Sequence, residues 1–172
     1  MFMKRTIFFF FILSTLTFQQ CYTLSGISIA PNTNTYYVSE FKNNAFNSPA
    51  NLEITVRETL DAKIRTETKL TDDNKNPDIE FKGSVVDYSV TAIAPKPGET
   101  AALNRLTIRL AVEYILYNTD QSVNEDESWK QNFSYFFEFD SNQNLADIEE
   151  GAITTILEKV MEDIFNKAFA NW

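Results

Sequence analysis

The stretch Leu106-Thr107-Ile108-Arg109-Leu110-Ala111-Val112-Glu113-Tyr114-Ile115-Leu116 carries the clearest pattern in the chain. Its even-numbered residues are all apolar or aromatic, while most of its odd-numbered residues are polar or small. Successive side chains of a β-strand point to opposite faces, so this alternation predicts a strand with one face in the core. A sheet built around this strand is the expected centre of the fold.

Two further stretches alternate in the same way and are expected to flank this strand. Residues 129–139 keep one phase throughout. Residues 78–92 alternate up to Val85 and then continue in the opposite phase from Val86. A shift of one residue exchanges the two faces of a strand, so this change predicts a β-bulge. Modest connecting loops, including a turn at 94–99, favour an antiparallel meander of the three strands.

Two segments show helical periodicity instead. Ser48 as N-cap and Pro49 at the first helical position predict a helix that runs to about Thr68, with apolar residues at every fourth position. A second helix is expected from Asn144, its N-cap, towards the end of the chain. The apolar arc of this second helix is broad, which is typical of a helix lying along a sheet.

The remaining elements complete the predicted fold. Tyr36–Phe41 is rich in β-prone residues and is expected to be the first strand. Residues 71–78 are expected to form a solvated turn. Their acidic spacing is a poor match to a calcium loop, because Pro77 stands where the loop requires glycine. The predicted fold class is α+β, with two helices packed on a mixed four-stranded sheet in the order β-α-β-β-β-α.

The N-terminus has the layout of a secretory signal peptide. Lys4 and Arg5 precede a short apolar run, and Ile7–Phe18 is too short to span a bilayer, which needs about 20 residues. We expect residues 1–20 to be a signal peptide, residues 21–35 a lipidated tether and residues 36–172 a single domain.

Cys21 is the only cysteine, so no disulfide within the chain is possible. A cysteine just after the apolar run is where bacterial lipoproteins are cleaved and acylated, and Cys21 is the predicted lipidation site. The preceding positions depart from the usual pattern, with Phe18 and Gln20 where leucine and a small residue are typical. The alternatives are ordinary cleavage nearby or an uncleaved anchor.

Composition bounds the function. Removing residues 1–20 takes the net charge from −9 to −11, because Lys4 and Arg5 leave with them. An acidic surface argues against nucleic acid as a partner. The chain has no histidine, so the commonest general base and metal ligand is missing. The adjacent Glu149 and Glu150 are explained by their place near a helix N-terminus. We therefore expect no enzyme activity, no cofactor and no metal.

The aromatic residues of the 129–139 stretch separate into two groups. One phase is expected to lie in the core under the helices rather than to form a lipid-binding face; it comprises Trp129, Phe133, Tyr135, Phe137 and Phe139. Phe136 has the opposite phase. An apolar side chain on the outer side of a sheet is typical of a surface that a partner covers.

Four stretches carry a resemblance to a known family. They are Leu24–Pro31, Thr100–Ile108, Asn142–Leu145 and Asp163–Trp172, the last ending Phe-Asn-Lys-Ala-Phe-Ala-Asn-Trp. In order and spacing they resemble the LptE family of lipopolysaccharide-assembly lipoproteins, in the branch found in Bacteroidota. The resemblance covers nearly the whole mature chain.

The resemblance implies a fold, a place and a partner. The family fold is two helices on a four-stranded mixed sheet. Its members are anchored on the periplasmic side of the outer membrane, plug the barrel of LptD, assist the assembly of that barrel and help to deliver lipopolysaccharide. No member is an enzyme.

The expected contact residues for lipopolysaccharide or the barrel are few. Family members use basic residues against lipid A phosphates, and this chain offers a sparse set, Lys96, Arg105 and Arg109, with Asn104 beside them and Phe136 on the outer face. Docking to the barrel is therefore favoured over direct lipopolysaccharide binding. The alternative function is a periplasm-facing lipoprotein that binds another lipid or glycan between helices and sheet.

Overall fold

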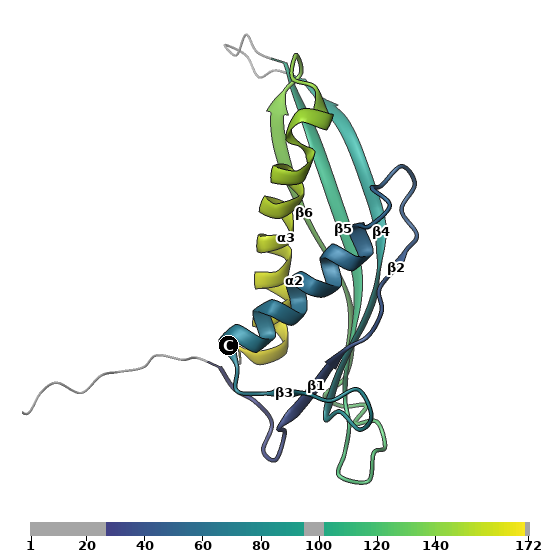
Figure 1. Ribbon diagram of the computed structural model, residues 1–172, viewed down its shortest axis with the longest axis vertical. Helices are drawn as coiled ribbons and strands as arrows, with labels where there is room; N and C mark the ends of the chain where they lie inside the picture. Colours follow the sequence, from purple (N-terminus) through teal and green to yellow (C-terminus); the bar gives the residue numbers. More distant parts are fainter. Residues whose placement is uncertain (1–26, 95–101, 171–172) are drawn as a thin grey trace, which may run out of the picture.

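The computed structural model describes residues 27–94 and 102–170 (Figure 1). The elements follow in the order β1 (Thr35–Val38), β2 (Lys42–Asn43), α2 (Leu52–Glu67), β3 (Thr71–Asp72), β4 (Ile79–Ile93), β5 (Leu103–Leu116), β6 (Trp129–Asp140) and α3 (Leu145–Phe169). The predicted lipidation site Cys21, the predicted turn at 94–99 beyond Ala94 and the contact residue Lys96 lie outside the described residues.

The three long strands form the predicted antiparallel meander. β4 pairs with β5, and β5 pairs with β6, over almost their whole lengths. The register shifts between Val85 and Asp87, which confirms the β-bulge that the change of phase predicted.

The sheet has more strands than the four expected, and the predicted count is wrong. Its order is β3-β1-β4-β5-β6, and β2 pairs with β4 beside β1. The expected first strand is interrupted, so that β1 ends at Val38 and β2 begins at Lys42. Phe41, between them, turns into the core and is 5% exposed. The prediction of a mixed α+β sheet with two helices is confirmed.

The second extra strand lies in the expected turn at 71–78. β3 pairs parallel with β1, through hydrogen bonds from the Thr71 amide to the Asn34 carbonyl and from the Asp73 amide to the Tyr36 carbonyl, both 2.9 Å. Both residues of β3 are exposed, so no apolar pattern marks this strand. It exists because its backbone pairs with a distant segment.

The first helix begins later than predicted. α2 starts at Leu52, with Asn51 at the N-cap position, and not at Pro49. The Ser48 hydroxyl donates to Asn43 Oδ1 at 2.9 Å and lies 3.2 Å from the Ala45 carbonyl, which it also contacts as a donor. These bonds hold Ser48 in the loop before the helix. For α3 the predicted cap is confirmed, because Asn144 Oδ1 accepts from the Ala146 amide.

The core lies between one face of the sheet and both helices. Figure 1 shows α2 and α3 on the same side of the sheet. Their apolar faces are fully buried at Leu60, Ile64, Ile156 and Val160. Glycine at position 83 makes room for the Phe41 ring on this side, since a Cβ there would overlap Phe41 Cε1. No helix among the described residues is long and apolar enough to cross a membrane.

The aromatic residues of β6 follow the predicted division with one exception. Phe133 and Phe139 are buried, and Trp129 and Phe137 are partly buried against the core. Tyr135 was expected in the core but is 37% exposed. β6 is the last strand of the sheet, so no further strand covers the side of Tyr135. Phe136 is exposed, as predicted.

Candidate functional site: the outer face of the sheet

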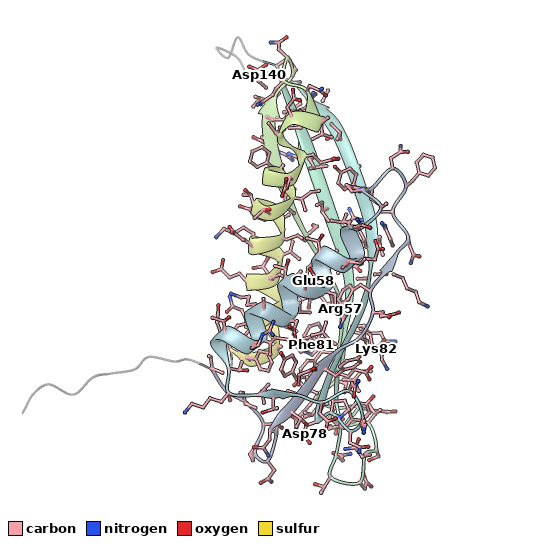
Figure 2. All side chains as sticks on the ribbon, viewed as in Figure 1. Arg57, Glu58, Asp78, Phe81, Lys82 and Asp140 are labelled. Atoms are coloured by element: carbon pink, nitrogen blue, oxygen red, sulfur yellow. The ribbon has the colours of Figure 1, made fainter. Side chains whose placement is uncertain are left out.

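The face of β4, β5 and β6 that points away from the helices is the candidate site, and we call it the outer face. Alternation assigns its residues directly. In Figure 2 the neighbours Phe81 and Lys82 of β4 lie on opposite sides of the strand. Phe81 is fully buried under the helices, while the Lys82 side chain is 44% exposed. Within the described chain, no helix packs over the outer face.

The register of the three strands arranges the outer face in rows. One row runs Lys82–Glu113–Lys130, with Lys130 Nζ 2.9 Å from Glu113 Oε1. The next charged row is Asp87–Arg109–Ser134, and beyond it lies Thr91–Arg105–Glu138. Each of these rows contains both a basic and an acidic residue, so the outer face is polar and close to charge balance. Opposite charges directly across a sheet also stabilise the pairing of its strands.

Arg105 and Phe136 meet at the end of this face that lies near Asp140. The Arg105 guanidinium carbon lies 4.0 Å from the centre of the Phe136 ring, which is a cation–π contact. The same guanidinium donates from Nε to Glu138 Oε1 at 3.1 Å. Arg105 thus holds an exposed aromatic ring in place and is itself already paired with a carboxylate.

A broad hollow occupies the other end of the outer face. Its volume is about 890 Å³, and it extends from the β1–β2 segment across to β6. Three lysines and two glutamates line it: Lys42, Lys82, Lys130, Glu40 and Glu113. Lysine ammonium groups bind phosphate or carboxylate, but here carboxylates offset most of their charge.

Beside this hollow lies Glu80, the most highly connected carboxylate of the sheet. It accepts hydrogen bonds from the hydroxyls of Ser39 and Tyr117, and Lys82 Nζ lies 2.9 Å from it. Burial by itself raises the pKa of Glu80, but these bonds outweigh it and lower the pKa below the ordinary value. Burial and the Glu80 bond raise the pKa of Tyr117 to about 12. Glu80 therefore stays ionised and ties the β1–β2 segment to the outer face.

The predicted contact residues divide between the two faces. Arg105, Arg109 and Phe136 share the outer face, through the pairs Arg105–Glu138, Thr107–Phe136 and Arg109–Ser134. Asn104 is in register with Phe139, which is buried on the helix side. The side chain of Asn104 therefore lies on the helix side of the sheet, opposite to that of Arg105.

Sequence reasoning did not single out the lysines of the hollow. Lys82 and Lys130 have the outward phase of their strands, so each was visible as an outer-face residue. What joins them across Glu113 is the register of three strands, which no local pattern reveals.

Solved structures of other proteins are similar to this one. The hypothetical protein CT253 from Chlamydia trachomatis shares the fold with a TM-score of 0.50 and 10% identity, over 81% of this chain and 99% of that one. Lipoprotein GNA1162 from Neisseria meningitidis is also similar, with a TM-score of 0.44 and 10% identity, over 77% of this chain and 99% of that one. No curated protein matches the chain in sequence.

The family comparison is more specific than the structural ones. The model of the lipopolysaccharide-assembly family LptE matches residues 33–168, which includes every helix and strand described above up to the last turn of α3. The chain therefore belongs to the LptE family of lipopolysaccharide-assembly proteins.

Proposed function

We propose that this chain is an outer-membrane lipoprotein that plugs the LptD β-barrel, helps to assemble it, and so assists lipopolysaccharide transport to the cell surface. Membership of the LptE family supports the pathway and the partner. The proposal that the chain contacts the barrel through its outer face is supported by one observation: this face is polar and is not covered by a helix.

The outer face has the chemistry that a barrel lumen requires. The interior of a large outer-membrane barrel is polar, because its apolar side chains face lipid. A plug in that lumen should present polar, charge-balanced side chains, and the rows through Glu113, Arg109 and Arg105 do so. Phe136 supplies one exposed aromatic side chain among them, and aromatic residues are enriched in protein interfaces.

The position of the first described residues suits an anchor at one end of the molecule. Ile27 forms a β-bridge with Ala170, and the Ser28 amide donates to the Phe169 carbonyl. Cys21 precedes Ile27 by six residues, a span of about 20 Å at most. An acylated Cys21 would thus hold the C-terminal end of α3 near the membrane, with the end near Asp140 pointing away (Figure 2).

Direct lipopolysaccharide binding has weaker support than docking. Arg105 is paired with Glu138, and the lysines of the hollow stand among glutamates. Phosphate recognition is strongest where cations are free to make bidentate contacts. We therefore assign lipopolysaccharide contact a secondary role, through Arg109 and the lysines of the hollow.

The alternative of a lipid or glycan held between helices and sheet is less well supported. That space contains side chains of both helices and of the sheet that are fully buried, including Leu60, Leu110 and Ile156. These side chains pack against one another there, as in a filled core.

A bulky substitution tests the docking mode. Ser134→Trp adds an indole midway along β6 on the outer face, where Ser134 is exposed. It is expected to abolish co-purification of the LptD barrel and to reduce surface lipopolysaccharide. Thr155→Trp, on the exposed side of α3, is the matched control and should leave both unchanged. Normal barrel recovery with Ser134→Trp, or loss with Thr155→Trp alone, would contradict the proposed face.

The anchor is tested separately. Mass spectrometry of the N-terminal peptide should find acyl chains on Cys21, and Cys21→Ala should abolish this modification. An unmodified Cys21 in the native protein would refute the lipoprotein assignment.

A further inference from the structure

One edge of β4 is paired over only half of its length. β1 pairs with Ile79–Phe81 and β2 with Ser84 and Val85, while β5 occupies the other edge as far as Ile93. From Val86 to Ile93, no strand of the described residues pairs with the first edge. Figure 1 shows β4 extending past the loop that follows β2, with β5 along its other edge and no further strand along this one. Alternate residues of this stretch direct backbone N–H and C=O groups outward.

This free edge has few of the usual features that prevent strand addition. Natural edge strands are protected by charged side chains (above all lysine), proline, β-bulges, short length or a covering segment. The β-bulge and the single charge, Asp87, both lie at the start of this stretch, so Tyr88–Ile93 has neither. The stretch reads Val86-Asp-Tyr-Ser-Val-Thr-Ala-Ile93, with no proline and no basic residue, and with high β-propensity. The free edge of β6 differs, because it carries Lys130 and the stacked rings of Tyr135 and Phe136, 5.5 Å apart.

A hollow of about 700 Å³ follows the free edge of β4. It lies between the loop after β2, β4 itself and the first turns of α3. Three of its apolar side chains are exposed: Phe46 at 84%, Val86 at 38% and Val90 at 44%. An added strand presents every second side chain to one face, so this hollow offers apolar contacts for alternate residues of such a strand.

The charges beside the edge define the occupant further. The hollow has two charged lining residues, Asp87 and Glu149, and both are carboxylates. Glu149 accepts from the Tyr88 hydroxyl, and Asp87 accepts from the Ser89 hydroxyl. A segment with lysine or arginine next to its apolar residues complements them.

We propose that the free edge of β4, from Val86 to Ile93, docks one extended segment of a partner protein, with alternating apolar residues and at least one lysine or arginine. The backbone groups of the edge bind the segment as an added strand, and Phe46, Val86 and Val90 contact its apolar side chains. A second copy of this chain fits poorly, because each copy carries a net charge of −9, or −11 without residues 1–20, and brings the same carboxylates to the contact. This inference concerns the edge of β4 with which β1 and β2 pair, and it does not depend on the barrel.

Hydrogen exchange of the full-length chain, purified in detergent as the cell produces it, tests the proposal. The probe is the synthetic peptide Thr-Val-Lys-Val-Thr-Val-Lys-Val. We expect fast exchange of the outward amides of Val86–Ile93 in the free protein and at least tenfold slower exchange with the probe. A peptide with glutamate for lysine should bind at least tenfold more weakly, and one with proline for every second valine should have no effect.

Two variants test whether the probe binds at the free edge of β4 rather than elsewhere on the surface. Val90→Lys and Phe46→Ser should each weaken the probe at least tenfold, while Ile54→Lys, at a similarly exposed site on α2, should not. Phe46→Ser keeps the test decisive if Val90→Lys fails to fold, because Phe46 lies outside the core.

Three outcomes would overturn the proposal. The first is slow exchange of these amides before any peptide is added. The second is equal protection by the lysine and glutamate peptides. The third is protection that rises with protein concentration together with dimer formation, which would assign the edge to a second copy.

Discussion

Replacing Gly83 by alanine tests whether the Phe41 ring, between β1 and β2, packs directly against the backbone of β4 at Gly83. Gly83 lies on the helix side of β4, opposite Val112 of β5. A Cβ at this position would overlap Cε1 of Phe41 and lie 2.9 Å from its Cζ and 2.7 Å from the Ala111 carbonyl oxygen. The Phe41 ring can shift, but the carbonyl belongs to the β5 backbone and cannot move without disturbing the ladder.

The size of the effect follows from this overlap. Adding a methyl group to a packed core costs about 1–3 kcal/mol, through displaced side chains and backbone. Alanine otherwise suits a strand better than glycine, so the overlap must outweigh a small favourable contribution. For a domain of this size each kcal/mol shifts the Tm by about 2–4 °C. We expect Gly83→Ala to lower the urea midpoint and to lower the Tm by several degrees.

Gly151→Ala is the matched control. Nothing lies within 4 Å of a Cβ at position 151, which is an exposed site inside α3. Glycine in a helix interior costs about 1 kcal/mol relative to alanine, so this variant should be more stable than the wild type. If Gly83→Ala unfolds at the wild-type urea concentration or above, Phe41 does not pack beneath Gly83 and our account of the split first strand is wrong.

Three further predictions concern single contacts. Tyr88→Phe removes the hydrogen bond to Glu149 that joins β4 to α3, and should cost about 1–2 kcal/mol in urea unfolding at pH 7. Tyr37→Phe, at a half-buried tyrosine with no such bond among the described residues, should cost little. Asn144→Ala should cost about 1 kcal/mol by the same measurement, because Asn144 caps α3, whereas Asn142→Ala should cost less. Asp78 accepts from the Asn34 amide and from the amide and hydroxyl of Thr35, and although burial raises its pKa, these bonds lower the pKa below the ordinary 3.8. The ionised Asp78 carboxylate therefore stabilises the folded protein above pH 3.8, and this stabilisation is lost as the pH falls through the lower pKa of the folded state. Between about pH 5 and about pH 2, the free energy of unfolding of Asp78→Asn should thus fall less than that of the wild type.

Much of the fold was predictable because its main elements carry local patterns. Alternation over Leu103–Leu116 and its two neighbours predicts the meander, and the change of phase at Val85 predicts the bulge. The parts that were wrong depend on pairings that have no periodic pattern. β3 is exposed and exists through hydrogen bonds to the distant strand β1. Ser48 does not cap α2 because its hydroxyl donates to Asn43, five residues earlier in the same loop.

The candidate site was less predictable than the fold. Asn104 and Arg105 are neighbours in sequence, and the same alternation that defines their strand places them on opposite faces. Arg105 and Phe136 are distant in sequence yet in contact, because the register of β5 and β6 brings them together. Phase predicts the face on which a residue lies, whereas register determines its neighbours.

The most direct test of the proposed docking is a photo-crosslinker placed in the full-length protein within living cells. A photoreactive residue at position 134, on the outer face, should crosslink to the LptD barrel, and one at position 155, on the exposed side of α3, should not. Crosslinks to the barrel from position 155 alone, or from neither position, would contradict the account.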